Sequence, residues 1–180
     1  MILDDYQDSP RPEPPDREAE ARALTEKCGY AAAALTLLPL PGSEIVGVVP
    51  VHVGMVVSIG HIYGVEVTRD SATQLLLRIG ATVGLSLVGS RLAMTCAKLI
   101  LPGVAGIVAA PLVYASTLAL GAVARAHFER GGLSDGEMRS VYAGAEHEGR
   151  QSYDPAGART PEARQAAGRA TGNDDEAAKS

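Results

Sequence analysis

The sequence predicts an all-α fold, a helical bundle with a central glycine- and alanine-rich antiparallel helix hairpin and disordered termini. Three observations lead to this prediction. The stretch Leu99–Ala124 contains no charged side chain. Apolar residues elsewhere recur at steps of three or four, which is the period of one helix face. Capping residues stand where these patterns begin, and proline or glycine stands where they stop.

Charge divides the chain into an apolar middle and two polar ends. Of the 37 charged residues in this 180-residue chain, seven lie in the range 31–124: Glu44, Glu66, Arg69, Asp70, Arg78, Arg91 and Lys98. We therefore expect a disordered N-terminal segment over residues 1–15, a helical domain over 16–149 and a disordered tail over 150–180, because both ends lack apolar periodicity. The net charge is −5 and no basic block is present, which argues against a nucleic-acid partner.

The first two expected helices lie before residue 65. Apolar and small side chains on one face of the first are Leu24, Cys28, Ala31, Leu35 and Leu38, and Pro39 and Pro41 end it. Ser43 is a candidate cap for the second helix, and Pro50 either begins this helix or kinks it. A β-strand is the alternative for the valine-rich range 45–57, although the caps around this range favour a helix.

The expected hairpin consists of the next two helices. Thr68 caps the first of them, and Leu75, Ile79, Val83 and Leu87 follow at a four-residue step beside Gly80 and Gly84, which permit close helix contact. Pro102 and Gly103 break the chain, and a helix over about 104–128 returns antiparallel to the first. Ser134 and Glu137 then form a capping box that begins a short polar helix.

No motif assigns a reaction, so we expect no enzyme, no cofactor and no metal site. The sequence has no Gly-x-x-x-x-Gly-Lys-Ser/Thr loop for phosphate and no Gly-x-Ser-x-Gly elbow. His52 and His61 are nine residues apart and would point to opposite faces of one helix. Cys28 and Cys96 form no Cys-x-x-Cys pair.

Arg91 and Lys98 form the candidate partner or buried-charge site, because they are the charged residues between Ile79 and Ala124. A charge at the centre of a membrane helix costs about 2.5–3.5 kcal/mol. The two residues therefore either form an exposed stripe on a soluble helix or face the bundle interior at a partner site.

Ten residues provide a structural signature: Pro39, Pro41, Met55, Tyr63, Gly64, Pro102, Gly103, Thr117, Gly121 and Phe128. Their order and spacing over about Cys28–Gly149 resemble the YcjF-type bacterial domain of unknown function. That domain is often attached to small Era/Ras-like GTPase domains or found beside them in multi-pass inner-membrane proteins. The family often carries a glutamine and an aspartate before its methionine, and these are replaced here by His52 and Glu44.

This resemblance implies an all-helical accessory module without catalytic residues, as a stand-alone member that lacks the GTPase domain. We expect it to associate with the cytoplasmic membrane, with both termini facing the cytoplasm, and to bind a protein partner such as a small GTPase. The uncharged middle also predicts a transmembrane helix, and the small-residue helix faces allow a homo-oligomer. The alternative is a soluble, cytoplasmic helical regulator or scaffold without membrane contact, which Arg91, Lys98 and the interrupting prolines favour.

Overall fold

The computed structural model describes residues 16–37, 43–84 and 105–171. These residues form α-helices and one short 3₁₀ turn, and no strand is present among them, which confirms the all-α prediction. The elements are α1 (Arg17–Leu37), α2 (Ser43–Ile62), α3 (Arg69–Val83), α5 (Ala105–Arg130), α6 (Asp135–Ser152), η1 (Gly157–Arg159) and α7 (Pro161–Thr171). The β-strand alternative for residues 45–57 is therefore wrong, and α2 begins at Ser43 and continues through Pro50.

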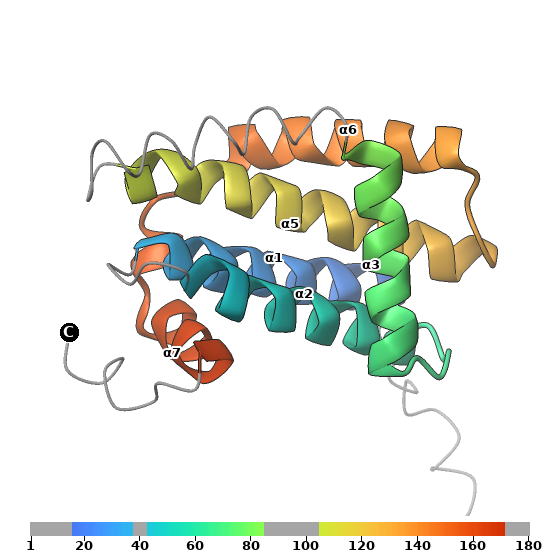
Figure 1. The fold of residues 1–180 in the computed structure, drawn as a ribbon, viewed down its shortest axis with the longest axis horizontal. Helices are drawn as coiled ribbons and strands as arrows, with labels where there is room; N and C mark the ends of the chain where they lie inside the picture. The colour runs from blue at the N-terminus through green and yellow to red at the C-terminus, as the bar shows by residue number, and fades with distance from the viewer. Residues whose placement is uncertain (1–15, 38–42, 85–104, 172–180) are drawn as a thin grey trace, which may run out of the picture.

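Helix α5 is the centre of the bundle (Figure 1). Helices α1 and α6 both pack along α5, and α2 packs against α1 and α5. α3 lies across one end of this group, where it contacts α2, α5 and α6, and α7 lies at the other end against α1 and α2 (Figure 1). In Figure 1 α3 lies across α5, and the hairpin stays a prediction because residues 85–104, which join its two helices, fall outside the described ranges. The expected turn at Pro102 and Gly103 lies outside the described residues.

The expected cap at Thr68 and the expected capping box at Ser134 are both present, and the cap at Thr68 is also a capping box. Thr68 and Ser71 exchange side-chain and backbone hydrogen bonds at the start of α3, and Ser134 and Glu137 do the same at the start of α6. Each box satisfies backbone N–H groups that have no partner within the first helical turn. Gly64 has a φ of +76° directly after α2, a left-handed conformation that favours glycine and ends the helix as expected.

The C-terminal region corrects one prediction. Residues 150–171, expected as part of a disordered tail, contain the last turn of α6, η1 and α7. Thr160 accepts a hydrogen bond from the Ala163 N–H at 3.2 Å, and Pro161 occupies the first helical position, so α7 has a clear start. Its buried face consists of Ala163, Ala167 and Gly168, which are too small to produce an apolar pattern in the sequence. Residues 1–15 and 172–180 lie outside the described residues.

Small residues let α1 and α5 approach closely. A Cβ atom added to Gly121 of α5 would overlap the side chain of Thr25 on α1, and one added to Gly29 of α1 would lie 2.9 Å from the Tyr114 ring. α6 approaches the other side of α5 in the same way, because a Cβ at Gly149 would lie 2.9 Å from the Ala115 Cα. These glycines therefore set the spacing of the three central helices.

Substituting Gly121 tests this spacing. We expect Gly121→Ala to lower the free energy of unfolding by about 1–2 kcal/mol, because overpacking against Thr25 outweighs the better helix propensity of alanine. Gly144→Ala is the control: Gly144 is exposed on α6 with no atom near its added Cβ, so this change should stabilise by about 0.5–1 kcal/mol. Urea denaturation measures both, and equal effects of the two substitutions would contradict the predicted close contact.

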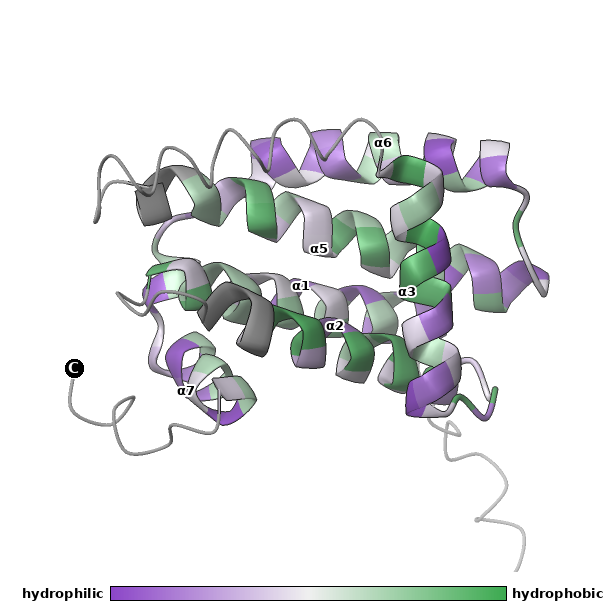
Figure 2. Ribbon diagram, viewed as in Figure 1, coloured by the Kyte–Doolittle hydropathy of each residue, from purple (hydrophilic) through white to green (hydrophobic). Residues whose placement is uncertain are grey.

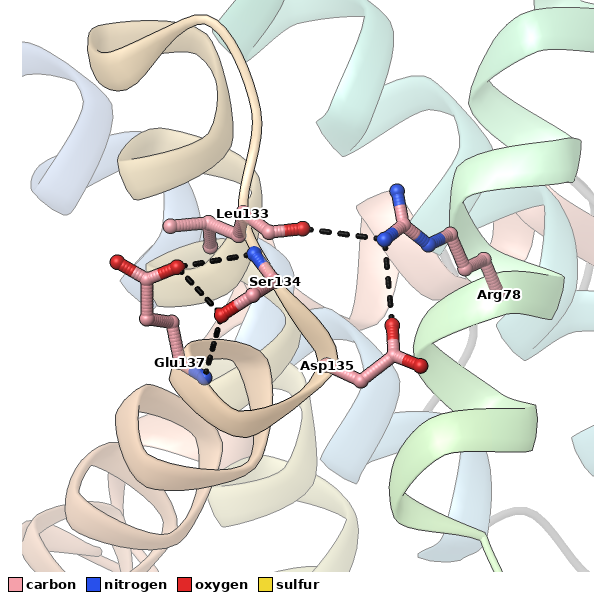
Figure 3. A network of polar contacts seen from close by, with 5 residues as sticks. All are labelled: Arg78, Leu133, Ser134, Asp135 and Glu137. Carbon is pink, nitrogen blue, oxygen red and sulfur yellow. Dashed lines mark hydrogen bonds and ion pairs between the residues drawn. The ribbon is translucent and has the colours of Figure 1, made fainter.

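A polar joint holds α3 against the α5–α6 connection (Figure 3). The Arg78 guanidinium donates to the Leu133 carbonyl oxygen at 3.1 Å and to the Asp135 carboxylate at 3.2 Å. The Ser134 backbone N–H next to this joint donates to the Glu137 carboxylate at 2.9 Å, and the hydrogen bonds from Ser134 lower the pKa of that carboxyl group. Arg78 and Asp135 are about half exposed, so their ion pair contributes at most about 1 kcal/mol and mainly fixes orientation.

His127 lies near this joint, in the last turn of α5. Its Nδ1 atom is buried without a hydrogen-bond partner among the described residues. Burial and, secondarily, the Arg78 cation lower the pKa of His127, because both disfavour the charged ring.

This lowered pKa predicts a pH dependence of stability. Below about pH 6.5, the ordinary pKa of histidine, the unfolded chain binds a proton at His127 more readily than the folded chain does. We therefore expect the denaturation midpoint to fall on acidification from about pH 7.5 to 5.5. His127→Gln should flatten this slope, and an equally steep slope in that variant would contradict the prediction.

Candidate functional site

The described signature residues lie at contacts between the helices of the bundle. Six signature residues lie in the described part of the chain: Met55, Tyr63, Gly64, Thr117, Gly121 and Phe128. Met55 is fully buried, and Tyr63 and Phe128 pack against the same cluster between α1, α2, α3 and α5. Pro39, Pro41, Pro102, Gly103, Arg91 and Lys98 lie outside the described residues, so the candidate site at Arg91 and Lys98 stays a prediction.

Thr117 belongs to a polar contact between α2 and α5 that the sequence patterns did not reveal. Its hydroxyl donates to the Val113 carbonyl oxygen at 2.8 Å, and the His52 Nε2 atom lies 2.9 Å from the same hydroxyl oxygen. The His52 ring and the Thr117 hydroxyl group are therefore hydrogen bonded across the contact between α2 and α5. Both residues are buried, so this bond fixes the packing of α2 on α5.

An exposed apolar surface on α2 and α3 is the strongest candidate for function. On α2 it comprises Val49, Pro50, Val53, Gly54 and Val57, and on α3 it comprises Leu76, Leu77, Gly80 and Ala81, all of them exposed or half-buried. Leu77 is 68% exposed and Val49 is 51% exposed. Figure 2 shows the hydrophobic colouring of α2 and of the middle of α3. Such surfaces mark contacts with proteins or membranes.

Charge is nearly absent from this exposed apolar surface. Residues 47–62 of α2 contain no Asp, Glu, Lys or Arg, and the part of α3 from Ala72 onward contains only Arg78. Arg78 does not present its charge on this surface, because its guanidinium group binds Leu133 and Asp135 (Figure 3). The polar joint therefore pairs the one charged residue in the apolar part of α3, while Arg69 and Asp70 are exposed in its first turn.

Helix α5 contains the span Ala109–Arg130, the candidate membrane span in the described part of the chain by length and apolar composition. However, 61% of its apolar window is buried inside the bundle. Its neighbours α1 and α6 carry charged residues, and Arg125 of α5 lies 3.9 Å from the Glu18 carboxylate of α1. In this structure α5 is the core helix of the bundle, and the expected transmembrane helix is not confirmed.

A cleft of about 280 Å³ lies between α1 and α6, with α5 as its floor. Its lining combines the apolar Leu118, Ala122 and Ala145 with the charged Arg22, Glu26, Arg125 and Glu148. Arg125 Nε is buried without a partner among the described residues, and burial, followed by the nearby Arg22 cation, lowers the pKa of Arg125. Because the lining of the cleft carries charges of both signs, the cleft favours neither an anionic nor a cationic ligand.

The cleft and its surroundings show no activated catalytic group among the described residues. Burial raises the pKa of the Cys28 thiol to about 11, so this thiol is protonated and a poor nucleophile at neutral pH. Burial also raises the pKa of Tyr114, and the Thr25 hydroxyl donates to the Ala21 carbonyl oxygen at 2.7 Å. Within the described ranges, no three His, Cys, Asp or Glu residues are grouped to hold a metal ion.

Comparison with known proteins places the chain in a family. Residues 14–138 match the family "Domain of unknown function (DUF697)". Magnetosome membrane protein 22 of Magnetospirillum gryphiswaldense is 30% identical over 142 residues, which cover 74% of this chain and 72% of that protein. No solved structure matches the chain. The family match includes both helices of the exposed apolar surface and ends within α6, before α7. By this match over most of its length, the chain belongs to the DUF697 family.

Proposed function

We propose that this protein is a non-enzymatic helical module that associates with the cytoplasmic membrane and binds a protein partner. The exposed apolar surface of α2 and α3 is the observation that carries the proposal, because Leu77 is largely exposed and Arg78, the charged residue next to it, is paired with Asp135. The name of the relative, magnetosome membrane protein 22, supports the proposed association with a membrane.

The proposed contact is peripheral. Helix α5 is enclosed by α1, α2 and α6, so inserting it into a bilayer would separate the closest contacts of the bundle. The apolar part of α2, Gly47–Ile62, is shorter than the roughly 20 residues that span the hydrocarbon layer. A bundle that lies on the membrane through α2 and α3 keeps all its internal contacts.

The size of the surface is consistent with reversible binding. Fully burying a leucine or valine side chain contributes about 1.5–3 kcal/mol, and Leu77 and Val49 are each more than half exposed in the free protein. Together with the half-buried Val53, Val57 and Leu76, they provide a few kcal/mol before the costs of association.

A small GTPase is the proposed protein partner. The support is the resemblance of the signature residues to the YcjF-type domain, in which a GTPase domain often accompanies the helical domain. The second candidate function is a soluble regulator or scaffold that uses the same surface to bind a protein. The burial of α5 favours this alternative, because the candidate membrane span of the described residues is then covered by protein and needs no lipid.

Replacing Leu77 tests the membrane contact. We expect Leu77→Glu to weaken binding to lipid vesicles about 10-fold, because burying this side chain contributes about 1–2 kcal/mol and a carboxylate opposes insertion. Gln74→Glu is the matched control, since Gln74 is also exposed on α3 and the same charge is introduced. Vesicle flotation measures both variants.

Both variants should unfold at the wild-type denaturant concentration, because neither side chain is buried. Equal flotation of Leu77→Glu and wild type would contradict the membrane proposal. If wild type does not float with vesicles and only a protein partner is lost in Leu77→Glu, the soluble regulator or scaffold is the better description.

The accessory role also predicts that the isolated chain does not bind guanine nucleotides. The sequence lacks the loop whose backbone N–H groups hold phosphates in P-loop proteins. A titration of the purified protein with fluorescent GTP should show no saturable binding at micromolar concentrations. Saturable binding in this range would contradict the proposal that the nucleotide is bound by a partner.

A further inference from the structure

The basic side chains that line the cleft between α1 and α6 lie together at one end of it. The Arg125 guanidinium group of α5 lies 3.9 Å from a carboxylate oxygen of Glu18 on α1, and Arg22 of α1 donates a hydrogen bond to the same oxygen at 3.1 Å. Arg22 and Arg125 both line the cleft. They form its basic end, at the level of the first turns of α1.

The acidic side chains of the lining lie farther along the cleft, at the level of Leu118. A Cβ added to Gly29 of α1 would lie 3.5 Å from Leu118, and one added to Gly149 of α6 would lie 3.2 Å from it. Glu26 stands about one turn before Gly29, and Glu148 directly precedes Gly149. Glu26 and Glu148 therefore form an acidic end, with one carboxylate from each wall of the cleft.

The separation of the two ends follows from helix geometry. Arg22 and Glu26 are four residues apart, which is about 6 Å along α1, and Arg125 and Leu118 are seven residues apart, which is about 10 Å along α5. Ala122 and other apolar side chains line the part of the cleft between the ends. The volume of about 280 Å³ limits an occupant to a small molecule.

The lining groups at both ends have unused binding capacity. The Arg125 side chain is 16% exposed, and its Nε atom is buried without an acceptor among the described residues. The 3.9 Å distance to Glu18 is too long for a hydrogen bond. Glu26 and Glu148 are exposed, and neither forms an ion pair with another residue in the described part of the chain. A buried guanidinium group without acceptors favours a ligand that provides them.

Other charged residues lie beside the cleft without lining it. Glu18 and Glu129 reduce the net charge around the basic end, but both are exposed and neither belongs to the lining. Near the acidic end, Lys27 is exposed outside the lining, and Arg150 forms an ion pair with Glu146 at 2.7 Å. A molecule inside the cleft therefore meets cations at one end and carboxylates at the other.

We propose that this cleft binds a small linear molecule with a carboxylate at one end and an ammonium group at the other. Arg22 and Arg125 hold the carboxylate by charge-assisted hydrogen bonds. Glu26 and Glu148 hold the ammonium group, and the apolar floor contacts the aliphatic chain between them. The chemical class is an amino carboxylate whose two charges are about 6–10 Å apart. A ligand with one charge uses one end and leaves the other unpaired.

The inference goes beyond the proposed membrane contact and does not depend on it. Helices α1 and α6 flank α5 (Figure 1), and Leu118 and Ala122 of α5 line the cleft. Leu120 and Ala124, in contrast, pack in the cluster shared with α2 and α3. Two residues correspond to about 200° around a helix, so the cleft faces away from α2. A protein bound to a membrane through α2 and α3 keeps the cleft open to a soluble ligand.

The test titrates the isotope-labelled full chain with 6-aminohexanoate, whose extended chain separates its charges by about 7 Å. Hexanoate and hexylammonium, which each carry one of these charges, are the controls at equal ionic strength. The NMR signal of the Arg125 Nε–H group reports the basic end, because this group has no acceptor among the described residues. Urea denaturation checks that each variant keeps the wild-type stability.

We expect 6-aminohexanoate to shift this signal saturably and to bind about 2- to 5-fold more tightly than hexanoate, which is the gain that an exposed ion pair provides. Hexylammonium should leave the signal nearly unchanged. Glu26→Gln should remove the advantage over hexanoate, whereas Glu20→Gln, exposed on the same helix outside the cleft, should keep it. Arg22→Gln should weaken the binding of both carboxylates, and Arg17→Gln, at another exposed position of α1, should not.

The absence of a saturable shift with 6-aminohexanoate would overturn the inference, as would an equal shift produced by sodium chloride at the same ionic strength. Equal affinities for 6-aminohexanoate and hexanoate would also overturn it, because the acidic end would then take no part. The same holds if Glu26→Gln and Glu20→Gln bind 6-aminohexanoate equally. Vesicle flotation tests the surface of α2 and α3, so the membrane proposal and this inference can fail separately.

Discussion

The close contact between α1 and α5 is the constraint on which the other packing depends. Thr25 of α1 lies against Gly121 of α5, and Gly29 of α1 lies against Tyr114 of α5. At both places a side chain of one helix touches the backbone of the other helix. α6 repeats this on the far side of α5 through Gly149 and Ala115. Because both neighbours approach so closely, α5 is enclosed, and the large apolar side chains exposed among the described residues are on α2, on α3 and in the connection between them. The small residues of the core therefore decide where the exposed apolar surface lies.

The parts of the fold that were predictable have local causes. Thr68 and Ser134 begin helices because their side chains satisfy backbone N–H groups within a few residues, and such signals are readable without tertiary structure. The crossing of α3 over α5 was not predictable, because it involves contacts between residues far apart in the chain, such as those of Arg78 with Leu133 and Asp135, more than 50 residues away. The His52–Thr117 bond was missed for the same reason, as the two residues are 65 positions apart.

Helix α7 was missed although a local signal was present. Thr160, Pro161 and Glu162 provide a cap, a residue suited to the first helical position and an acid near the positive helix end. Alanine-rich segments can be helical or unstructured, and what decides here is the packing of α7 against apolar residues of α1 and α2. The exposed apolar surface was also not predictable residue by residue. Leu75 and Leu77 are both leucines of the same helix, but Leu75 packs against the core and Leu77 is largely exposed. Burial is a property of neighbours, and the sequence pattern alone does not identify them.

The order of the helices along the chain has a consequence for biosynthesis. α5 contains the candidate membrane span of the described ranges, and α6, which covers one side of it, follows it in the chain. During translation α5 leaves the ribosome before α6, so one side of this largely apolar helix is uncovered until the polar helix has been made. Folding of α6 onto α5 therefore competes with any factor that recognises apolar nascent helices. The length of the α5–α6 connection, only four residues from Gly131 to Ser134, shortens that interval.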